Sequence, residues 1–124
     1  MATILVIDDE ETVLALLKEM LERAGYSVLT AGDGSEGMKL FNANSVDLVI
    51  TDIVMPEKEG IETIMEIRKA PGDVKVIAIS GGGRQEPEGY LGLAEQLGVK
   101  FTFTKPFKQD DLLGAVYELL KGKP

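Results

Sequence analysis

The chain contains no cysteine, no histidine and no tryptophan, and aromatic residues make up only 6% of its 124 residues. Without cysteine it can form no disulfide, no thiolate metal site and no cysteine nucleophile. Without histidine it cannot build a Ser-His triad, an imidazole general base or a histidine metal site. Any chemistry must therefore use carboxylates, lysine, hydroxyls, the backbone or a bound hard cation.

Long hydrophobic runs are also absent, because no stretch approaches the roughly 20 apolar residues of a membrane span. The N-terminus enters a strand-like run directly, so we expect no signal peptide and a cytoplasmic protein. The formal net charge of −8 argues against direct binding of nucleic acid by this chain. A hydrophobic fraction of 44% suffices for a packed core. We expect one domain over residues 1–121, with 122–124 as a frayed end or the start of a linker.

The most informative stretch is residues 46–56, an apolar run that ends in Asp52 and continues into Met55-Pro56. Its apolar residues indicate a strand buried on both faces, as in a parallel sheet. Pro56 lacks a backbone N–H and restricts the residue before it, so the strand should end near Asp52. The Asp52 carboxylate is then expected at the C-terminal edge of the sheet, where open α/β folds bind ligands.

Strands and helices are predicted to alternate along the chain. The predicted strands are 3–7, 26–31, 47–51, 74–79 and 100–104. The predicted helices are 11–24, 35–43, 61–69, a segment ending near 97, and 109–121. Asp9 and Asp33 are the expected N-caps of the first two helices, and Tyr117 is expected on the buried face of the last. Five βα units predict an α/β fold, a five-stranded parallel sheet in the flavodoxin-like order 2-1-3-4-5 with helices on both faces.

In this topology one set of polar residues meets at the carboxyl edge of the sheet. The set comprises Asp8 and Asp9 after the first strand, Asp52 after the third, Ser80 after the fourth and Lys105 after the fifth. Each residue alone has an ordinary explanation as a helix cap, a turn or a solvated loop residue. The combination is far more specific, because all of these groups fall at strand ends of one predicted fold.

Three carboxylates at one edge repel each other. Two unit charges about 4 Å apart cost roughly 4 kcal/mol at an effective dielectric near 20. Either some carboxylates are protonated or a cation lies among them, and all-oxygen ligands favour Mg²⁺, with Mn²⁺ as the alternative. The crowding also predicts that Asp8→Asn or Asp9→Asn raises the melting temperature in chelator while weakening Mg²⁺ binding.

The remaining groups suit a phosphoryl ligand. Lys105 and the Ser80 hydroxyl would complete an electropositive pocket for phosphoryl oxygens. The backbone N–H groups of Val54 and Gly81 are further candidate donors. Asp52 is the carboxylate best placed to attack a phosphorus atom.

These motifs resemble the receiver domain of bacterial two-component response regulators, and the chain is similar to the single-domain chemotaxis-type members. The resemblance covers essentially the whole chain. The matching segments are Asp8-Asp9, Asp52 to Pro56 with Gly60, Ser80-Gly81 and Lys105-Pro106-Phe107.

The resemblance implies that Asp52 is the phosphoacceptor of a signalling switch. It implies that Asp9, Asp52 and the Val54 carbonyl bind Mg²⁺, with Asp8 acting through metal-bound water. The donor would be a phosphohistidine on a sensor kinase or phosphotransfer protein. Such a protein is no enzyme beyond its own phosphorylation and dephosphorylation.

The resemblance also implies how the phosphoryl group is read. Ser80 and Lys105 would contact it and relay its presence, together with the backbone of Val54 and Gly81. The output would be the surface of the fourth helix, fifth strand and fifth helix, which would act on a partner or on an output domain elsewhere in a longer chain. No direct contact with nucleic acid or membrane is expected.

One departure from the family concerns residue 102. Many receivers carry an aromatic residue three positions before the lysine, and it moves inward on activation. Here that residue is Thr102, flanked by Phe101 and Phe103. Strand alternation places both rings on the opposite face from Thr102.

Three other functions compete with this interpretation. A phosphatase with an aspartyl nucleophile requires a second aspartate two residues after the first, where this chain has Val54. A flavodoxin requires a phosphate loop after the first strand, where this chain has four acidic residues, 8–11. A docking module with the receiver fold but no need of phosphorylation stays open as the main alternative.

Overall fold

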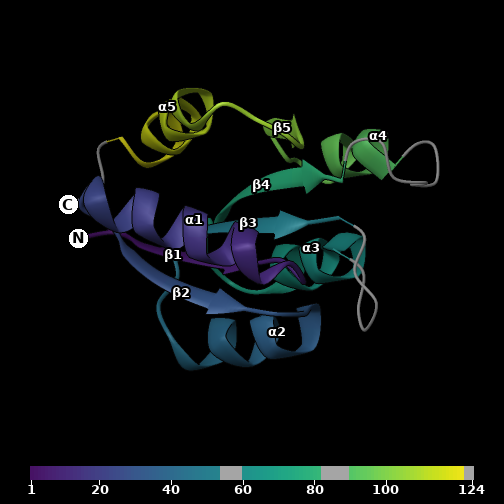
Figure 1. The fold of residues 1–124 in the computed structure, drawn as a ribbon. Coiled ribbons are helices and arrows are strands. Elements are labelled where there is room, and N and C mark those ends of the chain that lie inside the picture. Colours follow the sequence, from purple (N-terminus) through teal and green to yellow (C-terminus); the bar gives the residue numbers. More distant parts are fainter. Residues whose placement is uncertain (54–59, 82–89, 122–124) are drawn as a thin grey trace.

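In the computed structural model, which describes residues 1–53, 60–81 and 90–121, five parallel strands form a sheet covered by five helices (Figure 1). The strands are β1 Thr3–Ile7, β2 Ser27–Ala31, β3 Leu48–Asp52, β4 Lys75–Ser80 and β5 Phe101–Thr104. The helices are α1 Glu11–Arg23, α2 Gly34–Ala43, α3 Gly60–Lys69, α4 Tyr90–Gln96 and α5 Gln109–Leu120. The order β2-β1-β3-β4-β5 confirms the predicted fold. Residues 122–124, expected to fray or to begin a linker, lie outside the described residues.

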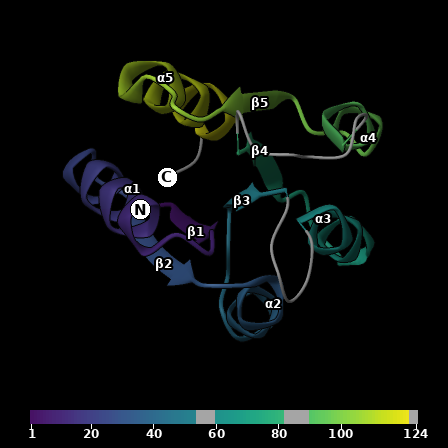
Figure 2. The same ribbon diagram turned by 45° about the vertical axis from the view of Figure 1, so that its right-hand side comes forward.

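The helices divide between the two faces of the sheet, with α1 and α5 on one face and α2, α3 and α4 on the other (Figure 2). The central strands supply apolar side chains to both faces because successive residues of a strand point in opposite directions. In β1, Leu5 and Ile7 join the core under α2 and α3. Ile4 and Val6 join the core under α1 and α5.

The first two helices begin in different ways. The Asp33 side chain accepts a hydrogen bond of 2.8 Å from the Glu36 N–H, which confirms Asp33 as the N-cap of α2. The expectation that Asp9 caps α1 is wrong, because Glu10 is at the N-cap position and makes no side-chain cap bond. Instead the Asp8 carboxylate accepts the Glu10 N–H at 2.9 Å. The helix nevertheless begins at Glu11, as predicted.

The buried face of α5 is narrower than predicted. Leu112, Ala115, Val116 and Leu120 are buried, whereas Tyr117 is 66% exposed. Ala115 lies on the same core-facing side of the helix as Leu112 and Val116, whereas Tyr117 lies outside it. The expectation that Tyr117 faces the core is therefore wrong.

Candidate functional site

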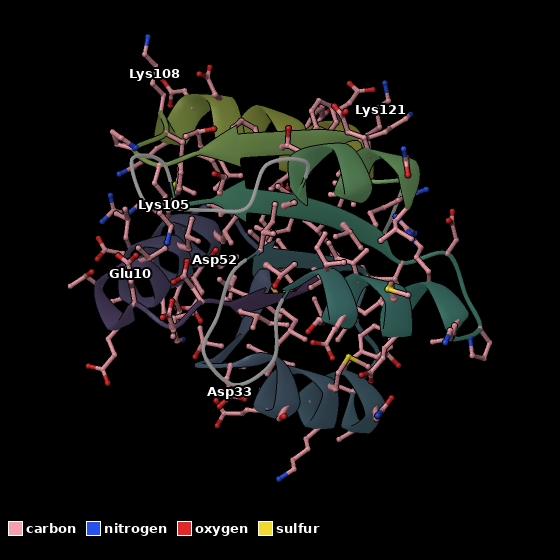
Figure 3. The ribbon with its side chains drawn as sticks, turned by 90° about the vertical axis from the view of Figure 1, so that its right-hand side faces the viewer. Glu10, Asp33, Asp52, Lys105, Lys108 and Lys121 are labelled. Carbon is pink, nitrogen blue, oxygen red and sulfur yellow. The ribbon has the colours of Figure 1, made fainter. Side chains whose placement is uncertain are left out.

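The parallel register brings the predicted polar residues to one edge of the sheet. Asp8 directly follows β1, Asp52 and Ser80 are the last residues of β3 and β4, and Lys105 directly follows β5. Asp52 pairs with Ile79 of β4, and Ser80 pairs with Thr104 of β5. Figure 3 shows Asp52 and Lys105 at the same end of the sheet.

Four carboxylates form the acidic cluster, namely Asp8, Asp9, Glu10 and Asp52. One oxygen from each lies within 4.8 Å of one from every other. Asp8 is fully buried and Asp52 is 4% exposed, so water screens their charges poorly. Glu10 was not among the predicted site residues, although the unbroken acidic run at 8–11 was a signal that could have found it.

The Lys105 ammonium lies among these carboxylates. Its Nζ is 2.9 Å from Asp8 Oδ2, 3.0 Å from Glu10 Oε1 and 3.1 Å from Asp52 Oδ2. Burial lowers the pKa of Lys105, but the hydrogen bonds to Asp8 and Glu10 and the charge of Asp52 outweigh burial and raise this pKa overall. Lys105 therefore stays protonated and offsets part of the negative charge.

Asp8 and Asp9 differ in how their carboxylates are satisfied. Burial raises the pKa of Asp8, although the Glu10 N–H and the Lys105 ammonium counteract part of that shift. Asp9 Oδ1 is buried and has no hydrogen-bond partner among the described residues. A buried carboxylate oxygen without a donor, beside three further carboxylates, suits a hard cation with oxygen ligands such as Mg²⁺. The residues present therefore fit the metal that the resemblance implies.

Ser80 is the last residue of β4, and Gly81 directly follows it. Ser80 is 6% exposed, and its carbonyl accepts a 2.9 Å hydrogen bond from the Lys105 N–H. This bond ties the backbone of the hydroxyl residue to that of the lysine, so the two lie at adjacent strand ends. Val54, expected to contribute backbone groups, lies outside the described residues.

Gly60 shows why one glycine of the motif is needed. Helix α3 begins there, and the Gly60 N–H donates to the Ile53 carbonyl at 2.6 Å. A Cβ on Gly60 would overlap the Asp52 carbonyl oxygen and lie 2.7 Å from the Ile53 Cα. Only glycine lets the chain return this closely behind Asp52.

The strand that precedes Lys105 has the alternation expected from its sequence. Phe101 and Phe103 both pack on the core beneath α1 and α5. The Phe103 ring lies 6.4 Å from that of Phe107, at an interplanar angle of 58°. Thr102 lies between them in β5 and is half-buried. The two rings therefore belong to the core, and neither takes the place of the aromatic residue that many receivers carry at the position of Thr102.

The fold and the site together define a class: a flavodoxin-like domain whose carboxyl edge carries clustered aspartates around a partly buried lysine. The family model described as "Response regulator receiver domain" matches residues 4–117. The chain therefore belongs to the receiver domain family of response regulators.

Curated relatives and solved structures agree with this family. The chain is 35% identical over 118 residues to the alkaline phosphatase synthesis transcriptional regulatory protein PhoP of Bacillus subtilis, covering 95% of this chain and 48% of PhoP. It is 36% identical over 121 residues to the transcriptional regulatory protein CpxR of Klebsiella pneumoniae, covering 98% of this chain and 50% of CpxR. The chain thus spans about half the length of these relatives.

Among solved structures, a receiver domain protein of Clostridium thermocellum matches with a TM-score of 0.85 and 38% identity, over 99% of this chain and 97% of that one. The response regulator TrrA of Thermotoga maritima, solved in complex with Mg²⁺-BeF, matches with a TM-score of 0.82 and 37% identity. That match covers 97% of this chain and all of TrrA, 100%.

Membership of the family sets the general function. Receiver domains serve phosphorylation-dependent signalling as switches rather than as classical enzymes, and they work with histidine kinases. They bind Mg²⁺, which the acidic cluster of this chain fits. In the described part of the chain, no helix has the length and apolar character needed to cross a membrane.

Proposed function

We propose that this chain is a switch in which Asp52 accepts a phosphoryl group from the phosphohistidine of a partner kinase or phosphotransfer protein in the cytoplasm. The observation that carries the proposal is the Lys105 Nζ, 3.1 Å from Asp52 Oδ2 within the acidic cluster. A carboxylate beside a fixed ammonium at a sheet edge suits attack on an anionic phosphoryl group, because the ammonium offsets the repulsion between the two anions.

Asp9 and Asp52 are the proposed Mg²⁺ ligands, with Asp8 acting through a metal-bound water. By family resemblance the Val54 carbonyl is a further ligand. The unpartnered Asp9 Oδ1 supports this assignment. When bound, Mg²⁺ supplies positive charge that neutralises the carboxylates and the incoming phosphoryl oxygens.

In the proposed step an Asp52 carboxylate oxygen attacks the phosphorus atom and forms an O–P bond. The N–P bond of the phosphohistidine breaks, and its electron pair leaves on the imidazole nitrogen, so the product is an aspartyl phosphate. Lys105 then exchanges part of its contact with Asp8 and Glu10 for a phosphoryl oxygen. The Ser80 hydroxyl and the backbone N–H groups of Gly81 and Val54 donate to the other oxygens.

The proposed output is a change on the surface formed by α4, β5 and α5, which regulates a partner or an output domain. Lys105 follows β5 directly, and its N–H bonds to the Ser80 carbonyl. A shift of Lys105 or Ser80 toward a phosphoryl group therefore acts on β5 and the segments that flank it. Thr102 offers no aromatic ring for this change, so the output here rests on Ser80 and Lys105.

Intact mass after incubation with acetyl phosphate and Mg²⁺ tests the proposal. The wild type should gain one phosphoryl group, and Asp52→Asn should gain none. Asp111→Asn, which alters an exposed aspartate in the first turn of α5, is the matched control and should gain as much as the wild type. No gain in the wild type, with Mg²⁺ binding verified, would favour the docking module that does not need phosphorylation.

A further inference from the structure

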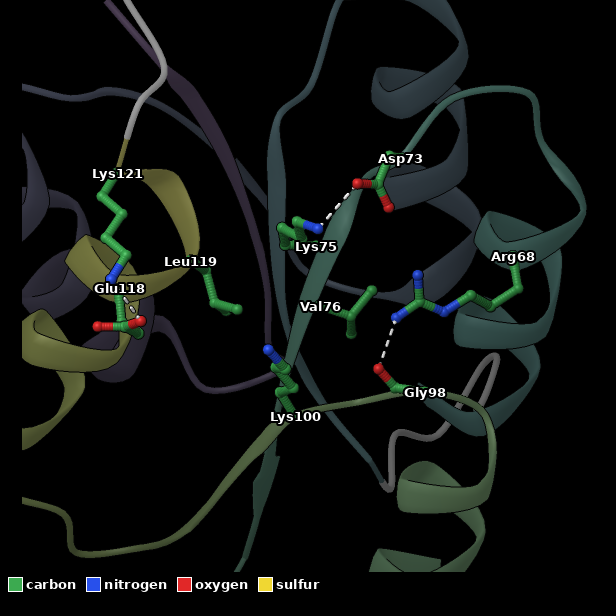
Figure 4. A pocket seen from close by; sticks show the side chains of 9 residues that line it. All are labelled: Arg68, Asp73, Lys75, Val76, Gly98, Lys100, Glu118, Leu119 and Lys121. Atoms are coloured by element: carbon green, nitrogen blue, oxygen red, sulfur yellow. Dashed lines mark hydrogen bonds and ion pairs between the residues drawn. The ribbon is translucent and has the colours of Figure 1, made fainter.

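A basic pocket lies at the N-terminal edge of the sheet, at the opposite end of the strands from the acidic cluster. Its volume is about 340 Å³, which is within the range of small-molecule sites. Figure 4 shows its lining side chains around a common space. They are Arg68, Asp73, Lys75, Val76, Gly98, Lys100, Glu118, Leu119 and Lys121.

The charge of the basic pocket is opposite to that of the whole chain. Its lining contains four cationic side chains and two carboxylates, a formal charge of +2 in a chain of net charge −8. Lys75 pairs with Asp73 at 2.8 Å, and Lys121 pairs with Glu118 at 2.9 Å. Lys100 is exposed and has no ion pair within the described part of the chain. The excess positive charge therefore resides on Lys100 and Arg68.

Arg68 is held in place without being neutralised. Its Nε donates to the Leu97 carbonyl at 2.9 Å, its Nη1 to the Val74 carbonyl at 3.0 Å and its Nη2 to the Gly98 carbonyl at 3.1 Å. Carbonyl oxygens satisfy N–H groups but carry no formal charge, so the full positive charge of Arg68 stays at the pocket wall. A cation fixed in this way loses little side-chain entropy when an anion binds.

Val76 and Leu119 add an apolar portion to the lining (Figure 4). Because Val76 is only 2% exposed, the half-buried Leu119 supplies most of the apolar surface. We propose that the basic pocket binds the phosphate group of a small phosphorylated molecule, with the phosphate against Arg68 and Lys100 and the carbon skeleton against Leu119. A dianionic phosphate matches the net charge of the lining.

This site is separate from the phosphoacceptor. The six residues of β4 span about 17 Å from Lys75, at the basic pocket, to Ser80, at the acidic cluster. Lys121 and Lys105 accordingly lie at opposite ends of the molecule in Figure 3. Arg68 donates hydrogen bonds to the carbonyls of the residues that directly follow α4. An anion bound to Arg68 would therefore affect the C-terminal end of α4, and could change the surface of α4, β5 and α5 independently of phosphorylation.

Titration of the wild type in chelator, followed by amide chemical shifts, tests the proposal. Inorganic phosphate, pyrophosphate and AMP are the probes, each at constant ionic strength because salt screens charge contacts. At least one probe should move the Val76, Gly98 and Lys100 amides saturably, with a Kd of about 1 mM or tighter. Tighter binding of AMP than of inorganic phosphate would support a contact between the carbon skeleton and the apolar lining. Tighter binding of pyrophosphate than of AMP would overturn that contact.

Two variants with the same charge change separate a site from general attraction. Lys100→Gln should weaken binding at least about fivefold, since it removes one of the two unneutralised cations. Lys39→Gln, at an exposed position of α2, should leave the Kd unchanged. Equal weakening by both variants, or no saturable shift up to about 10 mM probe, overturns the proposal. The test requires neither Mg²⁺ nor phosphorylation, so its outcome is independent of that of Asp52.

Discussion

Replacing Asp9 with asparagine should raise the melting temperature of the protein in chelator. The Asp9 oxygen lies within 4.8 Å of oxygens of Asp8, Glu10 and Asp52, and Asp9 Oδ1 has no hydrogen-bond partner among the described residues. The Lys105 ammonium is the cation bound within this cluster and contacts three of its four carboxylates, but not Asp9. Asparagine keeps the shape of the side chain and removes its charge.

The distances set the size of the effect. Two unit charges 4.8 Å apart repel by about 3.5 kcal/mol at an effective dielectric of 20 and by about 0.9 kcal/mol in bulk water. Asp9 is half-buried, and the Lys105 charge cancels part of the repulsion. We therefore expect Asp9→Asn to increase the free energy of unfolding by about 1–2 kcal/mol, a rise of roughly 3–10 °C in Tm for a domain of this size.

Thermal unfolding with chelator and with saturating Mg²⁺ is the assay. Mg²⁺ at one hundred times its Kd adds about 2.7 kcal/mol to the free energy of unfolding. Because Asp9 is a proposed Mg²⁺ ligand, the wild type should gain more stability from Mg²⁺ than Asp9→Asn does. Glu95→Gln removes one negative charge from an exposed position of α4 and controls for net charge. Asp8→Asn should give a smaller rise, because it also loses the 2.9 Å ion pair with Lys105. An unchanged or lower Tm of Asp9→Asn in chelator would refute clustered repulsion.

Three further substitutions test the structure around the site and the buried face of α5. Gly60→Ala should lower the free energy of unfolding by about 3 kcal/mol in urea denaturation, because its Cβ meets the backbone behind the acceptor; Gly92→Ala, with open space around it, should not. Leu112→Ala should cost about 2–5 kcal/mol in the same assay, against under about 0.5 kcal/mol for the exposed Tyr117→Ala. Lys105→Met should lower the free energy of unfolding by about 3–5 kcal/mol in chelator, because it leaves the clustered carboxylates without their ammonium partner. The loss should be smaller with Mg²⁺, and a loss that Mg²⁺ does not reduce would contradict the role of repulsion.

The fold was predictable because its signals are local. Runs of apolar, β-branched residues marked the buried strands, and Gly and Pro marked their ends. Asp33 was recognisable as a cap from its place before α2. The alternation of strands and helices then left one natural strand order. Asp8, Asp52, Ser80 and Lys105 were predictable as a group because parallel strands end at a common edge.

Other features depend on how side chains meet across long separations. The contact between Glu10 and Lys105 joins residues 95 positions apart, and no periodicity records it. The α1 N-cap was misplaced because the acidic run at 8–11 offers several candidate caps in sequence, and only the turn after β1 puts Glu10 at that position. The basic pocket likewise combines Arg68 and Lys100 from separate βα units, which no local motif indicates.

The most direct test of the central claim is chemical mapping of the phosphorylated residue. Borohydride reduces an aspartyl phosphate to homoserine, and peptide mass spectrometry then locates the changed residue. After phosphorylation by acetyl phosphate and Mg²⁺, homoserine should replace Asp52 and no other residue. Homoserine at Asp8 or Asp9, or a phosphorylated protein with Asp52 unchanged, would contradict the assignment of Asp52 as the phosphoacceptor.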